Sequence, residues 1–239
     1  MFARTIQRAL VRPASVASRR YVSTLEANPH IYVFPDEGSI NSHVLTLLSY
    51  SPPQPELAVG RSTKLPPTPD SFTENHKFLD ILQSVLAENA HQDQNVIAQA
   101  QAMASTSGSN LGSGGAFFPQ QNKKRGTSYG GGGGAGGDGA GGASSQGGAG
   151  GGGRGGYIHV YDLRRPPDFG RIPDPEDIFG SLEVDGRGNF VDGHGRYQSS
   201  GSYRVITRDG FLGLSPFLRQ RLVERLKLED ANLRSSAQT

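Results

Sequence analysis

Residues 157–185 have the sequence YIHVYDLRRPPDFGRIPDPEDIFGSLEVD, which constrains the fold more than any other stretch of this chain. Ile158 and Val160 alternate with polar or aromatic residues, and this period of two is typical of a strand with two unlike faces. Pro166 and Pro167 cannot donate the hydrogen bonds that a sheet needs. The pattern therefore predicts a strand that ends before these prolines.

A short turn and a second strand follow in the same stretch. Residues 173–180, PDPEDIFG, place a proline where the first turn of a helix tolerates one and cluster acidic residues near that turn. We therefore expect a short helical turn there. Leu182 and Val184 then begin another strand.

The composition allows one core of modest size. The chain of 239 residues contains 34 glycines and 15 prolines, and only 34% of its residues are hydrophobic, so less of it can form a core than its length suggests. It has no cysteine, which excludes disulfides and thiolate metal sites. No apolar run reaches the roughly 18 to 20 residues that a transmembrane helix needs.

The first 21 residues resemble a mitochondrial transit peptide. They contain five arginines and no acidic residue, and serine and alanine make up much of the remainder. The sequence at 19–21, Arg-Arg-Tyr, resembles the cleavage sites of matrix presequences, so we expect the mature chain to begin near Val22 and to reside in the mitochondrial matrix. The alternative is a basic amphipathic helix that stays attached and lies on a membrane surface.

Removal of this segment changes the charge balance. The whole chain carries 24 basic and 22 acidic residues, whereas the chain without residues 1–21 carries 19 basic and 22 acidic residues, a formal net charge of −3. A nucleic-acid-binding protein is expected to carry a basic surface. The mature chain therefore lacks the charge that is typical of that class.

Two strands and a helix are predicted between residues 22 and 104. Residues 30–34 and 44–50 are apolar runs of strand length. Beyond Thr73 the apolar residues recur on one helical face, with Ser71 or Thr73 as the expected N-cap. The Ala- and Gln-rich residues up to Ala104 could prolong this helix, although they offer few apolar side chains to anchor it.

Residues 105–156 are predicted to be a disordered insert. Glycine makes up 18 of the 27 residues between Gly130 and Gly156, and almost no apolar side chain is available for burial. Because the entropy cost of closing a loop grows only slowly with its length, such an insert can connect two parts of one domain. We therefore expect residues 22–104 and 157–230 to be two lobes of a single domain.

The second lobe should contain a hairpin turn, a further strand and a helix. Asp192-Gly193 is a hairpin signal, and residues 203–207 alternate like a strand that is closed by Asp209-Gly210. Ser215 is the expected N-cap of a helix that begins with Pro216 and runs to about residue 228.

The complete prediction is an α+β fold. It is a single small domain with a mainly antiparallel sheet and two principal helices against one face, split by the Gly-rich insert. The leucines of the last helix, at positions 218, 222 and 226, are expected to pack on the sheet. Residues 231–239 are expected to be a disordered tail.

Three carboxylates and one histidine are candidates for a metal or reactive site. Asp174, Glu176 and Asp177 lie within four positions and could bind a hard cation through their oxygens. The alternative is that they cap a short helix in solvent. His194, between two glycines, is a further candidate, and an exposed turn histidine is its alternative. No catalytic residue is assigned and no cofactor is predicted, because the sequence shows no nucleophile elbow, phosphate loop or close histidine pair.

Two short basic features favour RNA. Lys123, Lys124 and Arg125 form a basic cluster, and Arg154 lies in one Gly-Gly-Arg-Gly-Gly-Tyr sequence that resembles an arginine-glycine box. Such boxes bind through many repeated phosphate and stacking contacts, and this chain has one copy.

These observations leave three functional hypotheses. The first is a non-catalytic mitochondrial accessory or assembly protein that contacts other mitochondrial proteins, with peripheral association with the inner membrane as an option. The second is a mitochondrial RNA-binding factor. The third is an enzyme with a carboxylate-based site. The missing catalytic motifs and the acidic balance favour the first, and the sequence does not indicate an oligomeric state.

Overall fold

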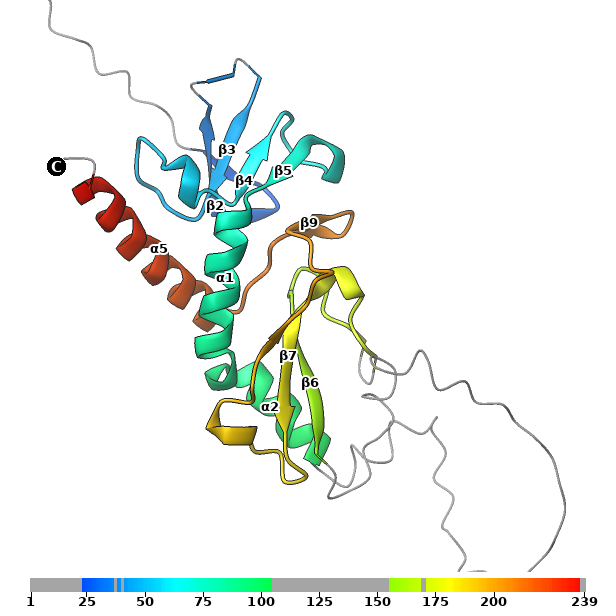
Figure 1. The fold of residues 1–239 in the computed structure, drawn as a ribbon. Coiled ribbons are helices and arrows are strands. Elements are labelled where there is room, and N and C mark those ends of the chain that lie inside the picture. The colour runs from blue at the N-terminus through cyan, green and yellow to red at the C-terminus, as the bar shows by residue number, and fades with distance from the viewer. Residues whose placement is uncertain (1–22, 37, 40, 105–154, 169–170, 237–239) are drawn as a thin grey trace, which may run out of the picture.

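The computed structural model describes residues 23–36, 38–39, 41–104, 155–168 and 171–236. The predicted transit peptide and the insert as far as Arg154 lie outside the described residues, and so do Lys123, Lys124 and Arg125. The described residues form two antiparallel sheets, a short β-hairpin and three α-helices (Figure 1). This arrangement confirms the predicted α+β class.

The larger sheet is an antiparallel meander of five strands in chain order. Its strands are β1 (Ser23–Leu25), β2 (Asn28–Pro35), β3 (His43–Thr46), β4 (Gly60–Ser62) and β5 (Phe72–Glu74). The strand predicted at 30–34 is confirmed within β2. The strand predicted at 44–50 is wrong beyond Thr46, because the N–H of Leu48 donates to the Thr46 hydroxyl oxygen (3.1 Å) and the chain turns out of the sheet.

The smaller sheet contains both strands predicted within residues 157–185. β6 (Gly156–Tyr161) pairs with β7 (Ile178–Val184), and β7 pairs with β8 (Gln198–Ser199). The chain leaves the sheet before Pro166, as predicted. The predicted helical turn is the short 3-10 helix η4 (Pro175–Asp177), which leads directly into β7.

The hairpin turn predicted at Asp192-Gly193 is wrong in position. Both residues have the positive φ angles of a tight turn, 54° and 79°. They lie, however, in the 3-10 helix η5 (Val191–Gly193), inside the long connection between β7 and β8. The chain already turns after β7, where the carboxylate of Asp185 accepts hydrogen bonds from the backbone N–H groups of residues 187 and 189.

A separate short hairpin follows β8. β9 (Ile206–Thr207) pairs with β10 (Gly210–Phe211) across a two-residue loop that ends with Asp209. The predicted turn is therefore confirmed. Only the end of the strand predicted at 203–207 is paired, and its first residues instead contact the core and β5.

Helix α1 (His76–Asn89) begins later than predicted. Its N-cap is Asn75, whose side-chain oxygen accepts a hydrogen bond from the N–H of Lys77 (3.1 Å). The predicted caps Ser71 and Thr73 are wrong, because the first ends the 3-10 helix η2 (Pro69–Ser71) and the second belongs to β5. Pairing of β5 with β4 outweighs the local cap signal.

The Ala- and Gln-rich residues form a helix of their own instead of prolonging α1. A 3-10 helix, η3 (Ala90–Gln92), separates α1 from α2 (Gln94–Ala104). Asp93 caps α2, because its Oδ1 accepts a hydrogen bond from the N–H of Asn95 (2.8 Å). Two small or branched residues of α2, Val96 and Ala100, are buried and anchor it.

Helix α5 (Pro216–Ser236) begins as predicted. The hydroxyl oxygen of Ser215 caps it by accepting a hydrogen bond from the N–H of Leu218 (3.1 Å). The helix continues past residue 228, so the predicted tail is wrong up to Ser236. The helix packs mainly against α1 and the 3-10 helix η1 (Pro55–Leu57), and its leucines at 218, 222 and 226 belong to the core that also contains residues of both sheets.

One hydrophobic core joins the two lobes. It includes Leu45 and Leu86 from the first lobe and Leu182 and Leu222 from the second, all fully buried. Helix α1 lies between the larger and the smaller sheet in Figure 1. In the part of the chain that the structure describes, no helix combines the length and apolar content needed to cross a membrane.

Candidate functional site

An open groove lies where the edge of the larger sheet faces the second lobe. Its volume is about 1180 Å³, and residues from the segments 69–76, 174–177 and 202–209 line it. Strand β5, helix η4 and strand β9 therefore contribute three of its walls. The groove is assembled from parts that are far apart in the sequence.

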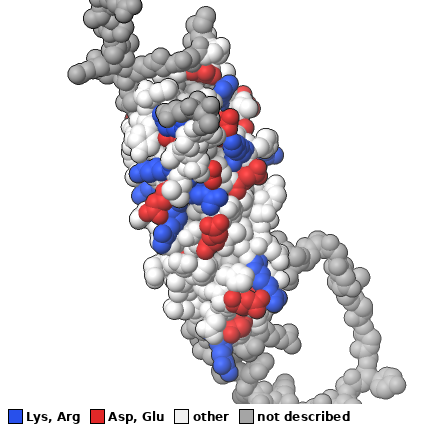
Figure 2. Space-filling view, turned by 60° about the vertical axis from the view of Figure 1, so that its left-hand side comes forward, with Lys and Arg blue, Asp and Glu red and all other residues white. Residues whose placement is uncertain are grey.

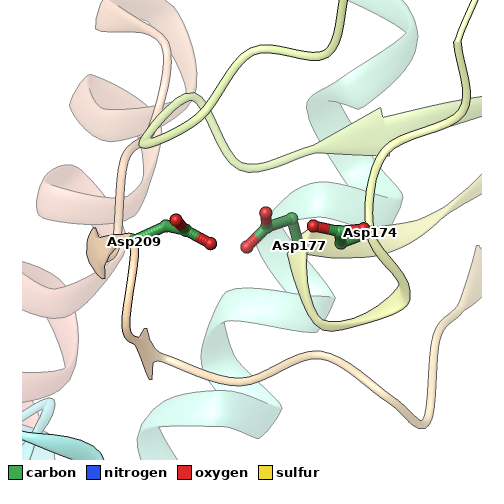
Figure 3. Close-up of side chains that lie close together, drawn as sticks. All are labelled: Asp174, Asp177 and Asp209. Atoms are coloured by element: carbon green, nitrogen blue, oxygen red, sulfur yellow. The ribbon is translucent and has the colours of Figure 1, made fainter.

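Three aspartates meet at one side of this groove. Asp174, Asp177 and Asp209 each place a carboxylate oxygen within 4.8 Å of the other two (Figure 3). Asp174 precedes η4 and its backbone carbonyl accepts the N–H of Asp177 (2.8 Å), which closes the turn that carries both residues. Asp209 comes from the turn between β9 and β10.

Two arginines form ion pairs with this aspartate cluster. The Nε of Arg164 donates to Asp177 at 2.7 Å, and both side chains are almost completely buried. The guanidinium of Arg165 lies 3.3 Å from the carboxylate of Asp209 and 3.9 Å from that of Asp174. Because the positive charge is already supplied by protein groups, the cluster is an ion-pair network and not a set of free ligands.

Arg164 also connects the backbone segments around the groove. Its two terminal nitrogens donate to four carbonyl oxygens, those of residues 176, 204, 205 and 210, at 2.6 to 3.4 Å. The guanidinium also lies over the ring of Tyr203, 5.6 Å from the ring centre. A fork of five N–H donors suits this task, which a lysine could not perform.

Asp162 and Tyr203 complete the buried network. Asp162 accepts hydrogen bonds from the N–H groups of Arg164 (2.9 Å) and Gly213 (2.8 Å) and from the Tyr203 hydroxyl (3.0 Å). Burial raises the pKa of Asp162, although the neighbouring Arg164 guanidinium acts in the opposite direction. Burial, together with the adjacent Asp162, also raises the pKa of the Tyr203 hydroxyl well above its ordinary value.

The structure brings three of the four predicted candidates to this groove. Asp174 and Asp177 belong to the aspartate cluster, whereas Glu176 lines the groove with no ion pair among the described residues. His194 is not among the lining residues. It follows η5 and lies close enough to His91 to lower the pKa of that residue, in addition to the larger effect of burial.

The groove also contains polar residues that the sequence did not indicate. Glu74 and His76 line it from the first lobe. The third member of the observed carboxylate cluster is Asp209, where the sequence had suggested Glu176. The Oε1 of Glu74 accepts the N–H of Val205 (2.8 Å) and so links β5 to the second lobe. The enzyme hypothesis required such a convergence, but the arginine pairing leaves few of these carboxylates free to act as a base.

Helix α5, the longest helix of the second lobe, has no face that carries charges of one sign only. Arg221 and Arg225 of α5 pair with Glu224 and Glu229 at 3.4 and 3.0 Å. Figure 2, which looks toward the side that carries α5, shows basic and acidic side chains interleaved. Such surface pairs contribute little to stability and do not form a basic stripe for nucleic acid.

The signals that could have revealed the groove are local but ambiguous. The Arg164-Arg165 pair and the Asp209-Gly210 turn were visible in the sequence, yet nothing showed that they meet. Only the packing of the β9–β10 hairpin beside η4 makes them neighbours.

Comparison with protein-family models, curated proteins and solved structures finds no match to this chain.

Proposed function

We propose that the chain is a non-catalytic accessory or assembly protein of the mitochondrial matrix that binds a segment of another protein in the groove. The observation that carries this proposal is the groove itself, an open depression with a mixed polar and apolar lining that both lobes build. The carboxylates of Asp177 and Asp209 are paired with arginines, which suits recognition of a partner more than proton transfer.

The outer edge of β5 gives the groove a second way to bind a partner segment, through backbone hydrogen bonds. β5 is the last strand of its sheet, so its outer edge pairs with no strand among the described residues. The carbonyl of Ser71 accepts a hydrogen bond from the N–H of Thr63, and the N–H of Asn75 donates one to the carbonyl of Val59, so both groups point to the side of β4. Alternate residues in an antiparallel strand direct their backbone groups to opposite sides, so those of Phe72 and Glu74 face outward. An extended partner segment could add hydrogen bonds there.

Exposed charges on the groove wall would select the partner. Glu176 and Arg208 are exposed, and neither has an ion pair among the described residues. Neither side chain is needed for the Arg164 network. Replacing them therefore tests the groove without disturbing the core.

The proposal is tested by affinity purification of the tagged full-length chain from intact mitochondria. The double variant Glu176→Lys/Arg208→Glu keeps the net charge, and we expect it to recover the partner several-fold less well than the wild type. Arg221→Glu/Glu224→Arg, an exchange on the far surface of α5, is the matched control and should recover the partner normally. If the groove variant retains every partner, or the wild type enriches none, the proposal is wrong.

The same preparation separates this function from RNA binding. Ultraviolet crosslinking should recover no RNA above background if the chain acts through protein contacts. RNA that crosslinks to the wild type and is lost when Lys123, Lys124, Arg125 and Arg154 are replaced by alanine would favour the second hypothesis. These four residues lie outside the part of the chain that the structure describes, so the sequence motif alone supports that alternative.

A further inference from the structure

A second, smaller cavity shares no lining residue with the groove. Its volume is about 220 Å³, and it is lined by the start of β2, the residues around Leu212 and the first turn of α5. Four leucines form its apolar part, and Asn28, His30 and Arg219 form its polar part. No carboxylate is among the residues that line it.

Arg219 is the unusual member of this cavity. It is half-buried, and within the described ranges it has neither an ion pair nor a side-chain hydrogen bond. Three other arginines of α5, Arg221, Arg225 and Arg234, each pair with an acidic residue one turn away. A partly desolvated guanidinium without an acceptor loses hydration that no protein group replaces.

His30 shares the polar end of the cavity with Arg219. His30 is an exposed residue that lines the same cavity as Arg219, and its pKa is lowered first by desolvation and then by the positive charge of Arg219. Asn28 fixes the rim, because its amide donates to the carbonyl of Leu212 (2.7 Å) and its oxygen accepts the N–H of His30 (3.1 Å). Two nitrogen-bearing side chains therefore converge on a space with no negative charge of its own.

We propose that this cavity binds a small organic carboxylate with a short apolar chain. The carboxylate pairs with the guanidinium of Arg219, where two parallel N–H donors match its two oxygens. The apolar chain lies against the leucines and loses its contact with water. The volume is below the range of about 300 to 1,000 Å³ typical of drug-sized ligands, which restricts the ligand to a few carbon atoms. This site does not depend on the groove or on its proposed partner.

Titration of the full chain with acetate, propionate and butyrate tests the site, with binding followed by calorimetry and by the NMR signals of His30. We expect saturable binding that strengthens roughly threefold with each added methylene, because each one buries more apolar surface. The bound carboxylate should raise the pKa of His30, since it offsets the charge of Arg219. Inorganic phosphate, which has no apolar part, should bind more weakly than butyrate.

Two matched variants make the result specific. Arg219→Gln should weaken butyrate binding at least about tenfold, because it removes a charge-assisted hydrogen bond. Arg221→Gln, two residues further along the same helix, should bind butyrate like the wild type, and both variants should keep the wild-type unfolding temperature. Equal butyrate binding by the Arg219 variant, an unchanged His30 pKa on saturation, or phosphate binding as tight as butyrate binding would each overturn the proposal.

Discussion

At the scale of single residues, Arg164 connects segments that line the groove. Its side chain is 2% exposed and joins Asp177 to four backbone carbonyls of three segments. We expect Arg164→Lys to lower the free energy of unfolding by about 3 kcal/mol, because lysine leaves several buried acceptors unpaired. Urea denaturation measures this loss. Arg165→Lys, at an exposed position, is the control and should change the stability by less than about 0.5 kcal/mol.

His159 gives stability a dependence on pH. Its Nδ1 lies 3.0 Å from the Ser181 hydroxyl, its Nε2 has no hydrogen-bond partner among the described residues, and burial lowers its pKa. The unfolded chain therefore binds protons more readily than the native chain, so stability falls as the pH drops through the ordinary histidine range and continues to fall until the native pKa is reached. His91 and His30, whose pKa values are also lowered, act in the same direction.

Replacement of His159 by glutamine tests this linkage. We expect the loss of unfolding free energy between pH 7.5 and pH 5.5 to be smaller in His159→Gln than in the wild type, because one proton-linked group has been removed. Urea denaturation at the two pH values measures the difference. The remaining histidines still make the free energy of unfolding depend on pH, so the variant should reduce this dependence and not abolish it. An unchanged slope would show that His159 is not the source.

At the scale of elements, the caps of two helices meet. The Ser215 hydroxyl, which caps α5, also donates to Asp93, the buried cap of α2. Ser215→Ala removes the cap and leaves a buried carboxylate oxygen without its donor. We expect a loss of about 2 to 3 kcal/mol in the free energy of unfolding. Ser215→Thr retains the hydroxyl and should recover most of it, and thermal unfolding followed by circular dichroism compares the two variants.

The elements that the sequence predicted are those with strong local signals. The alternation at Ile158 and Val160 identified β6, and the Ser215-Pro216 pair identified the start of α5. Signals that depend on distant partners failed. Ser71 and Thr73 look like helix caps, but the segment 60–62 draws this part of the chain into the sheet. The end of α5 was missed because Arg234 is held by Asp230 and by the carbonyl of Pro52, which is far away in sequence.

At the scale of the whole molecule, the same distinction applies to the candidate site. Asp174, Glu176 and Asp177 could be predicted as a cluster because they are neighbours in the chain. Asp209 and Glu74 could not, because only the tertiary fold brings them to the groove. The groove therefore needs both lobes, because residues 69–76 come from the first lobe and the aspartate cluster comes from the second.

Because the two lobes share one core, we can predict how the chain behaves when it is divided into two fragments. Leu182 and Leu222 of the second lobe belong to the same buried core as Leu45 and Leu86 of the first. We therefore expect the fragments 22–104 and 155–239 to be unfolded separately and to form a folded one-to-one complex when mixed. Circular dichroism and size-exclusion chromatography measure both states. Independent cooperative unfolding of either fragment would show that the lobes are separate domains.

Replacing residues 105–154 with a short Gly-Ser linker tests the same argument within one chain. Gly156 packs against the side chain of Met103, so the two points that the linker must connect lie close together. Closing a loop of about 10 residues in place of about 50 costs less entropy, and the logarithmic relation gives a gain of roughly 1.4 kcal/mol. We expect the shortened chain to unfold in one transition at equal or slightly higher urea concentration. A large loss of stability would mean that the removed residues contribute to the core, because the effect on loop entropy can only be favourable.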